Sequence, residues 1–349
     1  MTPKLVGICV MGLGEMGIIH ARNLARAPGV EVSLASRRKD ALHVLGTELH
    51  VPPERWFASY ESALASPQID AVVIATRPTE HPTHIQAAAA AGKHVFCEKP
   101  LGVAVRDIEQ ALAAVSDARR RQHPRPLLFM TGFHRRYDPS YHRGKQLLEA
   151  DRIGQPTVFK GTSGDPEYPV KYQRDIGYPA LLLDLAVHDI DLARWLLRSE
   201  VRQVHTVCAA LVYPHLLGLG DADTGVVVLE MENGTLASLH LCRAFQYGYN
   251  VTSELVGARG SLQLGELKGA GEAVRVLGAD GQSAERIVWD FGERFAQAFA
   301  REMQVFAEAV HSGSLPPDAP TEVDGLEATR VAEAMVRSWR TGQPQRVER

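Results

Sequence analysis

The sequence lacks the features that mark membrane, nucleic-acid-binding and disulfide-rich proteins. Its longest apolar runs reach about six to nine residues, far short of the roughly 20 that span a bilayer. The formal net charge is −3 over 349 residues, so no basic surface for nucleic acid is required. The four cysteines have no CxxC spacing, and no signal-peptide pattern precedes the first strand-like segment. We therefore expect a cytoplasmic protein with reduced thiols, no metal and no membrane partner.

The first third of the chain alternates short apolar runs with helical patterns. Strands are expected at Leu5–Val10, Val30–Ala35, Ala71–Thr76, His94–Cys97 and Leu127–Thr131, with helices between them. This alternation predicts an α/β domain with a doubly wound parallel sheet over residues 1–131. Such sheets bind ligands beyond the carboxyl ends of their strands.

The pattern changes after residue 132. Helices are expected near 140–150, 181–197, 295–310 and 326–338. Asn233-Gly234 lies between two strand-like runs and is a strong hairpin signal, because both turn positions tolerate positive φ. A second hairpin is expected around 257–260. Clustered strands predict a separate α+β domain with an antiparallel or mixed sheet over residues 132–349.

A glycine motif directly follows the first strand. Gly12, Gly14 and Gly17 match G-x-G-x-x-G, with Glu15 and Met16 inside the motif. The first glycine permits the tight turn, the second lets a pyrophosphate approach, and the third lets helix and strand pack closely. Glycine triplets also occur in structural turns, but this strand–turn–helix context predicts a Rossmann-type dinucleotide site.

The end of the second strand carries cations where NAD-binding proteins usually carry a carboxylate. The residues there are Ser36, Arg37 and Arg38. Two guanidinium groups can bind a 2′-phosphate, so we predict NADP in preference to NAD. The alternative is that both arginines form a solvated helix start. Glu15 argues mildly against additional phosphate charge.

Further candidates follow the next strands of the same sheet. Thr76 is expected along the cofactor, and His81 near one of its riboses. Glu98 and Lys99 end the fifth strand, where Pro100 keeps Lys99 out of helical geometry. An ammonium there can stabilise a developing negative oxygen, whereas the alternative is a surface lysine. His20 has no partner pattern, and we expect it on a helix surface or in packing.

An Asp-His pattern lies on a predicted helix of the second domain. Asp184, His188 and Asp191 are spaced i, i+4 and i+7 and share one face, whereas Asp189 points elsewhere. Histidine suits proton transfer near neutral pH. The alternative is a helix cap or an interdomain salt bridge. No cluster has the spacing of metal ligands, so we expect no metal.

These motifs together resemble one family. The segments AAGKHVFCEKPL (90–101), GFHRRYDPSY (132–141), LLLDLAVHDIDLARWL (181–196) and YGYN (247–250) are similar to those of the glucose–fructose oxidoreductase/inositol dehydrogenase (Gfo/Idh/MocA) family, and within it to inositol 2-dehydrogenase-like members. The resemblance implies a large open, mostly antiparallel sheet in the second domain, through which members form homodimers or homotetramers. It also implies a cis Lys99-Pro100 peptide.

The resemblance further implies an oxidoreductase that acts on a hydroxyl of a cyclic polyol or sugar. His188 would take the hydroxyl proton while hydride passes to the nicotinamide. Lys99 would polarise the substrate oxygen, and Asp184 would bind substrate and orient His188. We also expect substrate contacts from Arg135, Asp165 and Tyr247. The alternatives for these three are, in turn, an interdomain salt bridge, a turn former and sheet packing.

One departure leaves the substrate open. Inositol-type relatives usually have two glycines where this chain has Pro179-Ala180, so the substrate loop is reshaped. An NADPH-dependent ketose or anhydro-sugar reductase is an alternative, as is a redox-assisted glycosidase with tightly held NAD. A non-catalytic NAD(P)-binding sensor would not need Lys99, Asp184 and His188 together.

Overall fold

The computed structural model describes residues 5–121, 126–168, 178–246, 248–265 and 290–349. The chain forms two compact units: Met1–Tyr137 with Gln297–Leu326, and Asp138–Ala296 with Glu327–Arg349. The sequence alone predicted one boundary, after residue 131. The difference arises because helix α9 (Ala296–Ser312) is amphipathic and buries Met303, Phe306 and Val310 in the core of unit 1.

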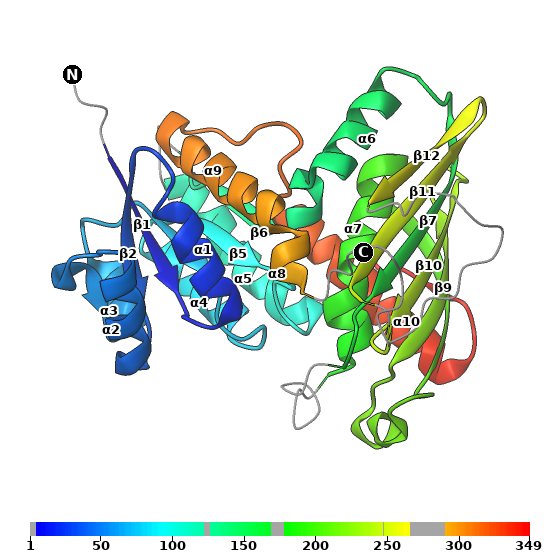
Figure 1. Cartoon of the computed structure of the whole chain (residues 1–349), viewed down its shortest axis with the longest axis horizontal. Helices are drawn as coiled ribbons and strands as arrows, with labels where there is room; N and C mark the ends of the chain where they lie inside the picture. The colour runs from blue at the N-terminus through cyan, green and yellow to red at the C-terminus, as the bar shows by residue number, and fades with distance from the viewer. Residues whose placement is uncertain (1–4, 122–125, 169–177, 247, 266–289) are drawn as a thin grey trace. The chain divides into compact units, whose positions relative to one another are not determined.

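Unit 1 is the predicted doubly wound parallel sheet (Figure 1). Its strand order is β3-β2-β1-β4-β5-β6, and every pairing is parallel. The strands are β1 (Val6–Met11), β2 (Val30–Ala35), β3 (Trp56–Phe57), β4 (Ala71–Ile74), β5 (His94–Glu98) and β6 (Phe129–Gly132). The helices between them are α1 (Glu15–Leu24), α2 (Lys39–Glu48), α3 (Tyr60–Ala65), α4 (His81–Ala90) and α5 (Val105–Arg121). The strand order reverses between β1 and β4, the switch point where such sheets bind ligands.

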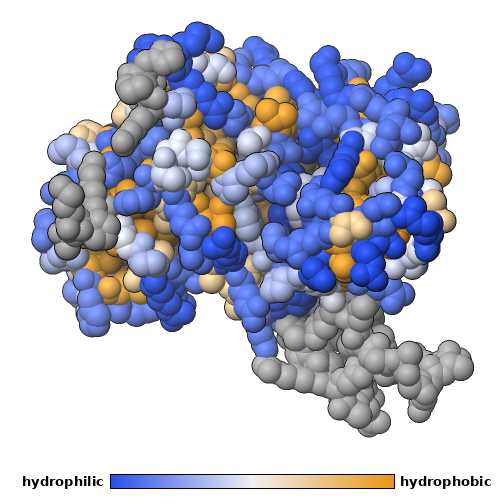
Figure 2. Space-filling model, turned by 90° about the horizontal axis from the view of Figure 1, so that it is seen from above, coloured by the Kyte–Doolittle hydropathy of each residue, from blue (hydrophilic) through white to orange (hydrophobic). Residues whose placement is uncertain are grey.

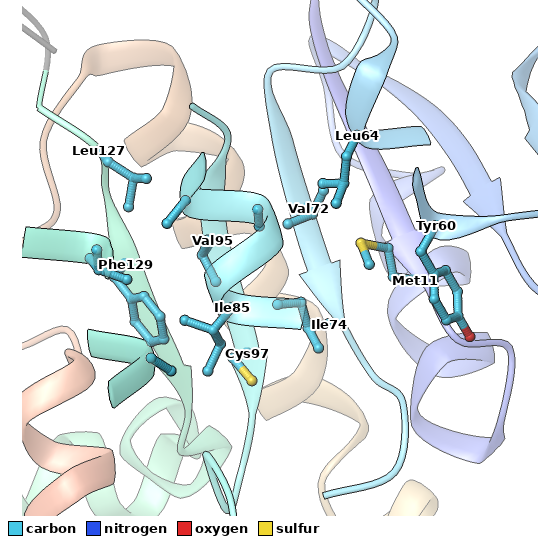
Figure 3. Close-up of a cluster of buried hydrophobic side chains, with 14 of the residues drawn as sticks. Met11, Tyr60, Leu64, Val72, Ile74, Ile85, Val95, Cys97, Leu127 and Phe129 are labelled. Atoms are coloured by element: carbon cyan, nitrogen blue, oxygen red, sulfur yellow. The ribbon is translucent and has the colours of Figure 1, made fainter. Parts of the chain in front are cut away.

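Both faces of this sheet are buried, which explains the continuous apolar runs in the sequence. Met11, Ile74 and Cys97 face one core with Ile85 of α4 (Figure 3). Their strand neighbours, including Val73 and Phe96, belong to the opposite core. The side chains of a strand alternate between faces with period two, so each residue's position in the strand decides which core it joins.

Unit 2 contains the predicted mostly antiparallel sheet. Its order is β12-β11-β7-β10-β9-β8-β13. The strands are β7 (Pro156–Gly164), β8 (Val201–Ala209), β9 (Thr224–Met231), β10 (Leu236–Cys242), β11 (Asn250–Gly257), β12 (Gly260–Gly265) and β13 (Gln345–Arg346). Both predicted hairpins are present, β9–β10 and β11–β12. In the described residues the parallel pairing is β7 with β10.

The helices of unit 2 leave one sheet face uncovered by described residues. They are α6 (Pro139–Glu149), the π-helical turn η4 (Leu181–Leu185), α7 (Ala186–Leu197), the 3-10 helix η5 (Pro214–Leu219), α8 (Phe291–Arg294) and part of α10 (Glu322–Thr341). Helix α7 packs on β7 and β10 (Figure 1). Val226 and Val228 of β9 are exposed, while the alternating Val227 and Leu229 are buried. The outward face of this sheet is therefore partly hydrophobic.

Figure 2 shows one face of the molecule, on which hydrophilic residues predominate and hydrophobic residues emerge in small groups. Among the described helices, none is both long enough and apolar enough to cross a membrane.

Candidate functional site

The glycine turn of unit 1 leaves open space at the start of α1. Gly12 has φ +93°, and a Cβ there would lie 2.7 Å from the Ala75 carbonyl oxygen. A Cβ on Gly17 would lie 1.8 Å from the Gly12 oxygen, so the third glycine closes the turn. Gly14 is the N-cap of α1, and nothing lies within 4 Å of the position of its Cβ. Open space thus faces a helix N-terminus, which fits a dinucleotide.

Thr76 and His81 lie beside this turn. Thr76 Oγ1 is buried and has no hydrogen-bond partner in the described part of the chain, which fits its predicted place along a bound cofactor. The His81 nitrogens lie 2.8 Å from the Pro100 oxygen and 3.1 Å from the Thr76 oxygen. Burial lowers the pKa of His81, and a neutral imidazole can donate to only one of these two carbonyl oxygens. Its contact with a ribose stays a prediction.

The predicted NADP-selecting residues lie at the carboxyl end of β2. Arg38 donates to the Leu13 oxygen over 2.6 Å, so its guanidinium reaches the glycine turn. The Arg38 backbone N–H donates to Ser36 Oγ. Arg37 is mostly exposed and pairs with Glu80 at 2.8 Å. Helix α2 also begins here, at Lys39. Both arginines therefore precede a helix start, Arg38 adds positive charge near the turn, and the charge of Arg37 is paired with Glu80.

The Glu98-Lys99 segment is held from inside unit 1. The Lys99-Pro100 peptide is cis, as the resemblance implied. The Lys99 backbone N–H donates to Glu98 Oε2 over 3.2 Å. Glu98 Oε1 lies 2.5 Å from His20 Nε2. His20, expected on a surface or in packing without a partner, is therefore a buried partner of Glu98. A Cβ on Gly132 would come within 3.0 Å of Glu98 Oε2, so that glycine leaves room for the carboxylate.

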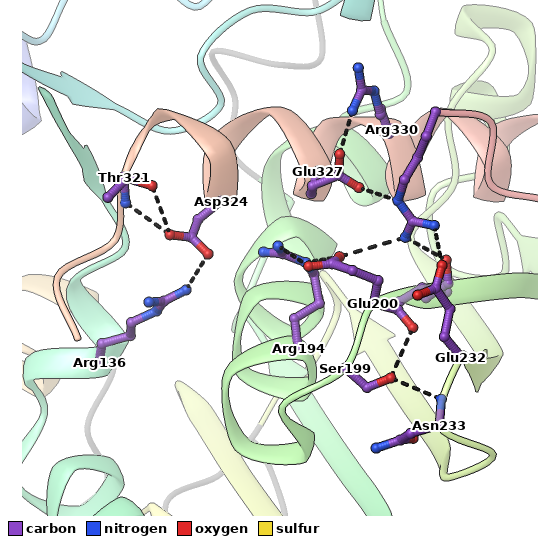
Figure 4. Close-up of polar contacts among 12 residues, drawn as sticks. Arg136, Arg194, Ser199, Glu200, Glu232, Asn233, Thr321, Asp324, Glu327 and Arg330 are labelled. Atoms are coloured by element: carbon purple, nitrogen blue, oxygen red, sulfur yellow. Dashed lines mark hydrogen bonds and ion pairs between the residues drawn. The ribbon is translucent and has the colours of Figure 1, made fainter. Parts of the chain in front are cut away.

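The two arginines after β6 are both buried in the short helix η2 (His134–Tyr137). Arg136 pairs with Asp324 at 2.9 Å, and Asp324 also accepts from the Thr321 backbone N–H (Figure 4). Arg136 therefore stabilises unit 1. Arg135 is also buried, and its contact with substrate stays a prediction.

The Asp-His helix of unit 2 begins with a carboxylate at its N-terminus. Asp221 accepts from the backbone N–H groups of Ala180 (2.9 Å) and Leu181 (3.2 Å). A carboxylate there satisfies end groups and complements the helix dipole. Asp184 lies in the π-helical turn, and His188 lies in the first turn of α7. Both side chains are buried. The Pro179-Ala180 start therefore anchors the helix that carries both residues.

A buried arginine, which sequence reasoning missed, contacts Asp184. Arg243 follows β10 and Asp165 follows β7, and these parallel neighbours pair Cys242 with Gly164. Arg243 donates to Asp184 Oδ2 over 2.6 Å, and its Nε lies 3.2 Å from Asp165 Oδ2. The guanidinium thus compensates both carboxylates. Hydrogen bonding of Asp165 to a polyol stays a prediction.

Aromatic side chains surround this cluster. The Tyr168 ring lies 5.6 Å from the Arg243 guanidinium carbon, and its hydroxyl donates to Asp221. Burial raises the pKa of Tyr168 and of the nearby Tyr178. Ser163 of β7 donates to Asp189 over 2.5 Å, in keeping with the expectation that Asp189 points elsewhere. The predicted substrate residue Tyr247 lies outside the described residues.

A second polar network ties the ends of elements in unit 2. Arg194 of α7 pairs with Glu200 at 2.7 Å, and Arg349 pairs with Glu327 at 2.9 Å (Figure 4). Ser199 accepts from the Asn233 backbone N–H at the β9–β10 turn. These contacts secure the carboxyl end of α7, the end opposite His188.

Comparisons with known proteins cover nearly the whole chain. Residues 6–124 match a family model described as oxidoreductase family, NAD-binding Rossmann fold, and residues 141–263 match a GFO/IDH/MocA C-terminal domain. An uncharacterized oxidoreductase of Bacillus subtilis is 35% identical over 100% of this chain and 98% of its own. The scyllo-inositol 2-dehydrogenase (NAD(+)) of the same organism is 32% identical over 97% of this chain and 95% of its own.

A solved structure gives the same result for the fold. Scyllo-inositol dehydrogenase from Lactobacillus casei, with bound NAD(H) and scyllo-inositol, superimposes with a TM-score of 0.87 at 30% identity, over 99% of each chain.

Proposed function

Because the chain belongs to the GFO/IDH/MocA oxidoreductase family, we propose that it transfers hydride between a nicotinamide cofactor and a secondary hydroxyl or ketone of a cyclic polyol. Unit 1 supports this with an open glycine turn at the start of α1. The observation that carries the proposal is the buried group in unit 2, where His188 and Asp184 share a helix and Arg243 pairs with Asp184. Relatives of similar length are named inositol 2-dehydrogenases.

The proposed chemistry divides the work among three side chains. The cofactor supplies a carbon that accepts or releases hydride. His188 takes the hydroxyl proton, for which an imidazole is suited near neutral pH. Lys99 polarises the same oxygen with its ammonium. Asp184 accepts a hydrogen bond from the polyol and orients His188, while Arg243 pairs with this carboxylate and holds it in place.

The decisive test is a panel of inositols, aldoses and ketoses, assayed with NAD and NADP by absorbance of the reduced cofactor. Lys99→Ala and His188→Ala should each cut turnover about 100-fold or more and leave cofactor affinity within about twofold. His142→Ala, on the exposed surface of α6, is the matched control. Near-normal turnover in either variant would remove that residue's role. A wild-type protein that binds cofactor but turns over nothing in the panel would favour the sensor alternative.

We further propose that NADP is preferred. Arg38 reaches the glycine turn, and Ser36 replaces the usual carboxylate, while Arg37 next to them pairs with Glu80. Ser36→Asp should shift the ratio of kcat/KM toward NAD, since a carboxylate repels a 2′-phosphate and accepts from a 2′-hydroxyl. An unchanged ratio would count against this assignment. NADP preference would also favour reduction of a ketose or anhydro-sugar as the working direction.

Self-association through the outward face of the unit 2 sheet is also proposed. Val207, Val226, Val228 and Leu236 form an apolar patch there, each close to or above half exposed. Contiguous exposed apolar side chains mark interaction surfaces, so a homodimer or homotetramer is expected. A cytoplasmic location fits the four free cysteines. The panel of polyols decides which one is the substrate.

A further inference from the structure

Three ionisable side chains meet inside unit 1, behind the Glu98-Lys99 segment. His20 comes from α1, Glu98 from the end of β5 and Glu302 from α9. Their ligand-type atoms all lie within 4.8 Å of one another, and all three residues are buried. The sequence motifs did not predict that these three side chains lie together, because they come from distant parts of the sequence.

The surroundings of this cluster are aromatic. The His20 ring stands edge-on to Phe96, at 5.3 Å, and to Phe299, at 6.1 Å. Glu302 is fully buried, and neither of its carboxylate oxygens has a hydrogen-bond partner among the described residues. Two carboxylates cannot both stay ionised at low cost in such a place. Burial first, and then the charge of Glu98, raise the pKa of Glu302 well above its usual range.

We propose that His20, Glu98 and Glu302 form a proton-sharing brace that positions Lys99. In this brace Glu302 is a neutral acid, Glu98 is the carboxylate, and His20 donates to Glu98. As far as it concerns catalysis, the inference rests on the proposed function.

The geometry explains how such a brace would act. Glu98 Oε1 receives the His20 contact at 2.5 Å, and Oε2 receives the Lys99 backbone N–H at 3.2 Å. An ionised carboxylate has about four acceptor sites. Glu98 therefore keeps acceptor sites to which a protonated Glu302 could donate. The two observed contacts, from His20 and from the Lys99 backbone, fix the Glu98 carboxylate at the start of the Lys99-Pro100 turn. A protonated Glu302, whose carboxylate lies within 4.8 Å, would add a third donor. No step of hydride transfer passes through the brace, so these are positioning residues.

Other ionisable groups near the cluster have different partners. The His134 ring lies 4.4 Å from the ring of Phe299, tilted by 37°. Phe299 precedes Glu302 by one turn of α9. His81 interacts electrostatically with Glu98, but its ring nitrogens contact two carbonyls. The pH dependence assigned to Glu302 therefore depends on His20 and Glu98 directly, with these two imidazoles further away.

A metal is the competing explanation for a His-Glu-Glu cluster. Ligands at about 2.0 Å around a tetrahedral zinc stand about 3.3 Å apart. His20 and Glu98 are only 2.5 Å apart, which is a direct hydrogen bond. The observed spacing therefore favours a direct hydrogen bond between His20 and Glu98 over two ligands of one metal.

The test uses the full-length protein and two matched pairs, Glu302→Gln with Glu302→Leu, and His20→Gln with His20→Leu. In each pair the glutamine keeps a neutral hydrogen-bond donor and the leucine removes it. Urea unfolding is measured from pH 5 to 9, together with kcat, its pH profile and the cofactor dissociation constant. Metal content of the purified protein is measured by mass spectrometry.

If Glu302 holds a proton in the folded protein, it must release that proton on unfolding at any pH above its pKa in the unfolded chain. The equilibrium constant for unfolding then rises by up to about tenfold per pH unit. Glu302→Gln should remove this slope and keep turnover, as rescue by a conservative variant. His20→Leu and Glu302→Leu should lower kcat about tenfold to 100-fold, the cost of misplacing a reacting group, with the cofactor dissociation constant within about twofold. His20→Gln should restore most of that loss.

An unchanged pH slope in Glu302→Gln would overturn the shared proton, and unchanged kcat in both leucine variants would overturn the positioning role. A stoichiometric divalent metal that Glu302→Gln loses would assign the cluster to a metal instead. If the wild type oxidises and reduces nothing, the proposed function fails on its own, and the pH slope still decides the shared proton.

Discussion

Removing the charge of Arg243 should destabilise unit 2 by an amount that the structure lets us bound. Arg243 is 2% exposed and pairs with Asp184 at 2.6 Å and Asp165 at 3.2 Å. Arg243→Met keeps much of the apolar stem and strands both carboxylates. Breaking a buried pair costs about 3–5 kcal/mol. Asp165 keeps some contact with solvent, so its share is small, and we expect about 3 kcal/mol.

The assay is thermal and urea unfolding at pH 7. For a unit of this size each kcal/mol lowers Tm by about 2–4 °C, so the expected fall is about 6–12 °C. The exposed pair Arg202–Glu230, at 2.8 Å, provides the control, and Arg202→Met should cost at most about 1 kcal/mol. Adding Asp184→Asn to Arg243→Met removes a stranded charge, so the double variant should recover about 1–3 kcal/mol.

Two results would refute this reasoning. If Arg243→Met is no more destabilising than Arg202→Met, the arginine does not compensate the buried charges of Asp184 and Asp165. A double variant with fully additive losses would show that Arg243 and Asp184 do not interact energetically.

Three further predictions concern the glycine turn, the buried cysteines and the outward face of the unit 2 sheet. Gly14→Ala should fold normally and weaken NADPH binding in a fluorescence titration, whereas Gly17→Ala should also lower Tm, because its Cβ would collide with the turn; equal behaviour of the two would contradict the assigned roles. Burial raises the pKa of Cys9 strongly and that of Cys208 to about 12, so iodoacetamide at pH 8 should label either thiol only after unfolding, as read by mass spectrometry. Val226→Lys should reduce the assembly mass in light scattering, and an unchanged mass would exclude this strand from the interface.

Much of the fold could be predicted from local sequence. The strands of unit 1 are buried on both faces, so they appear as continuous apolar runs between helical patterns. The Asn233-Gly234 turn marks the β9–β10 hairpin because Gly234 adopts φ +85°. The glycine motif, Glu98-Lys99 and the spacing of Asp184 and His188 are likewise local patterns.

The partners of these residues could not be predicted in the same way. His20 and Glu98 are 78 positions apart, and Arg243 meets Asp165 only because β10 lies parallel beside β7. A glutamate within the apolar stripe of a helix, such as Glu302 in α9, indicates a buried charge or acid. Its partner cannot be read from the sequence, because it depends on which sheet face the helix covers.

The sequence by itself determined which segments become strands, helices and turns, and which side chains carry chemistry, because these depend on near neighbours and on side-chain type. Only the tertiary structure decided which buried charges face one another, because the pairing of distant strands and the packing of α9 set those distances. The electrostatics of a buried group depends on its surroundings rather than on its own identity.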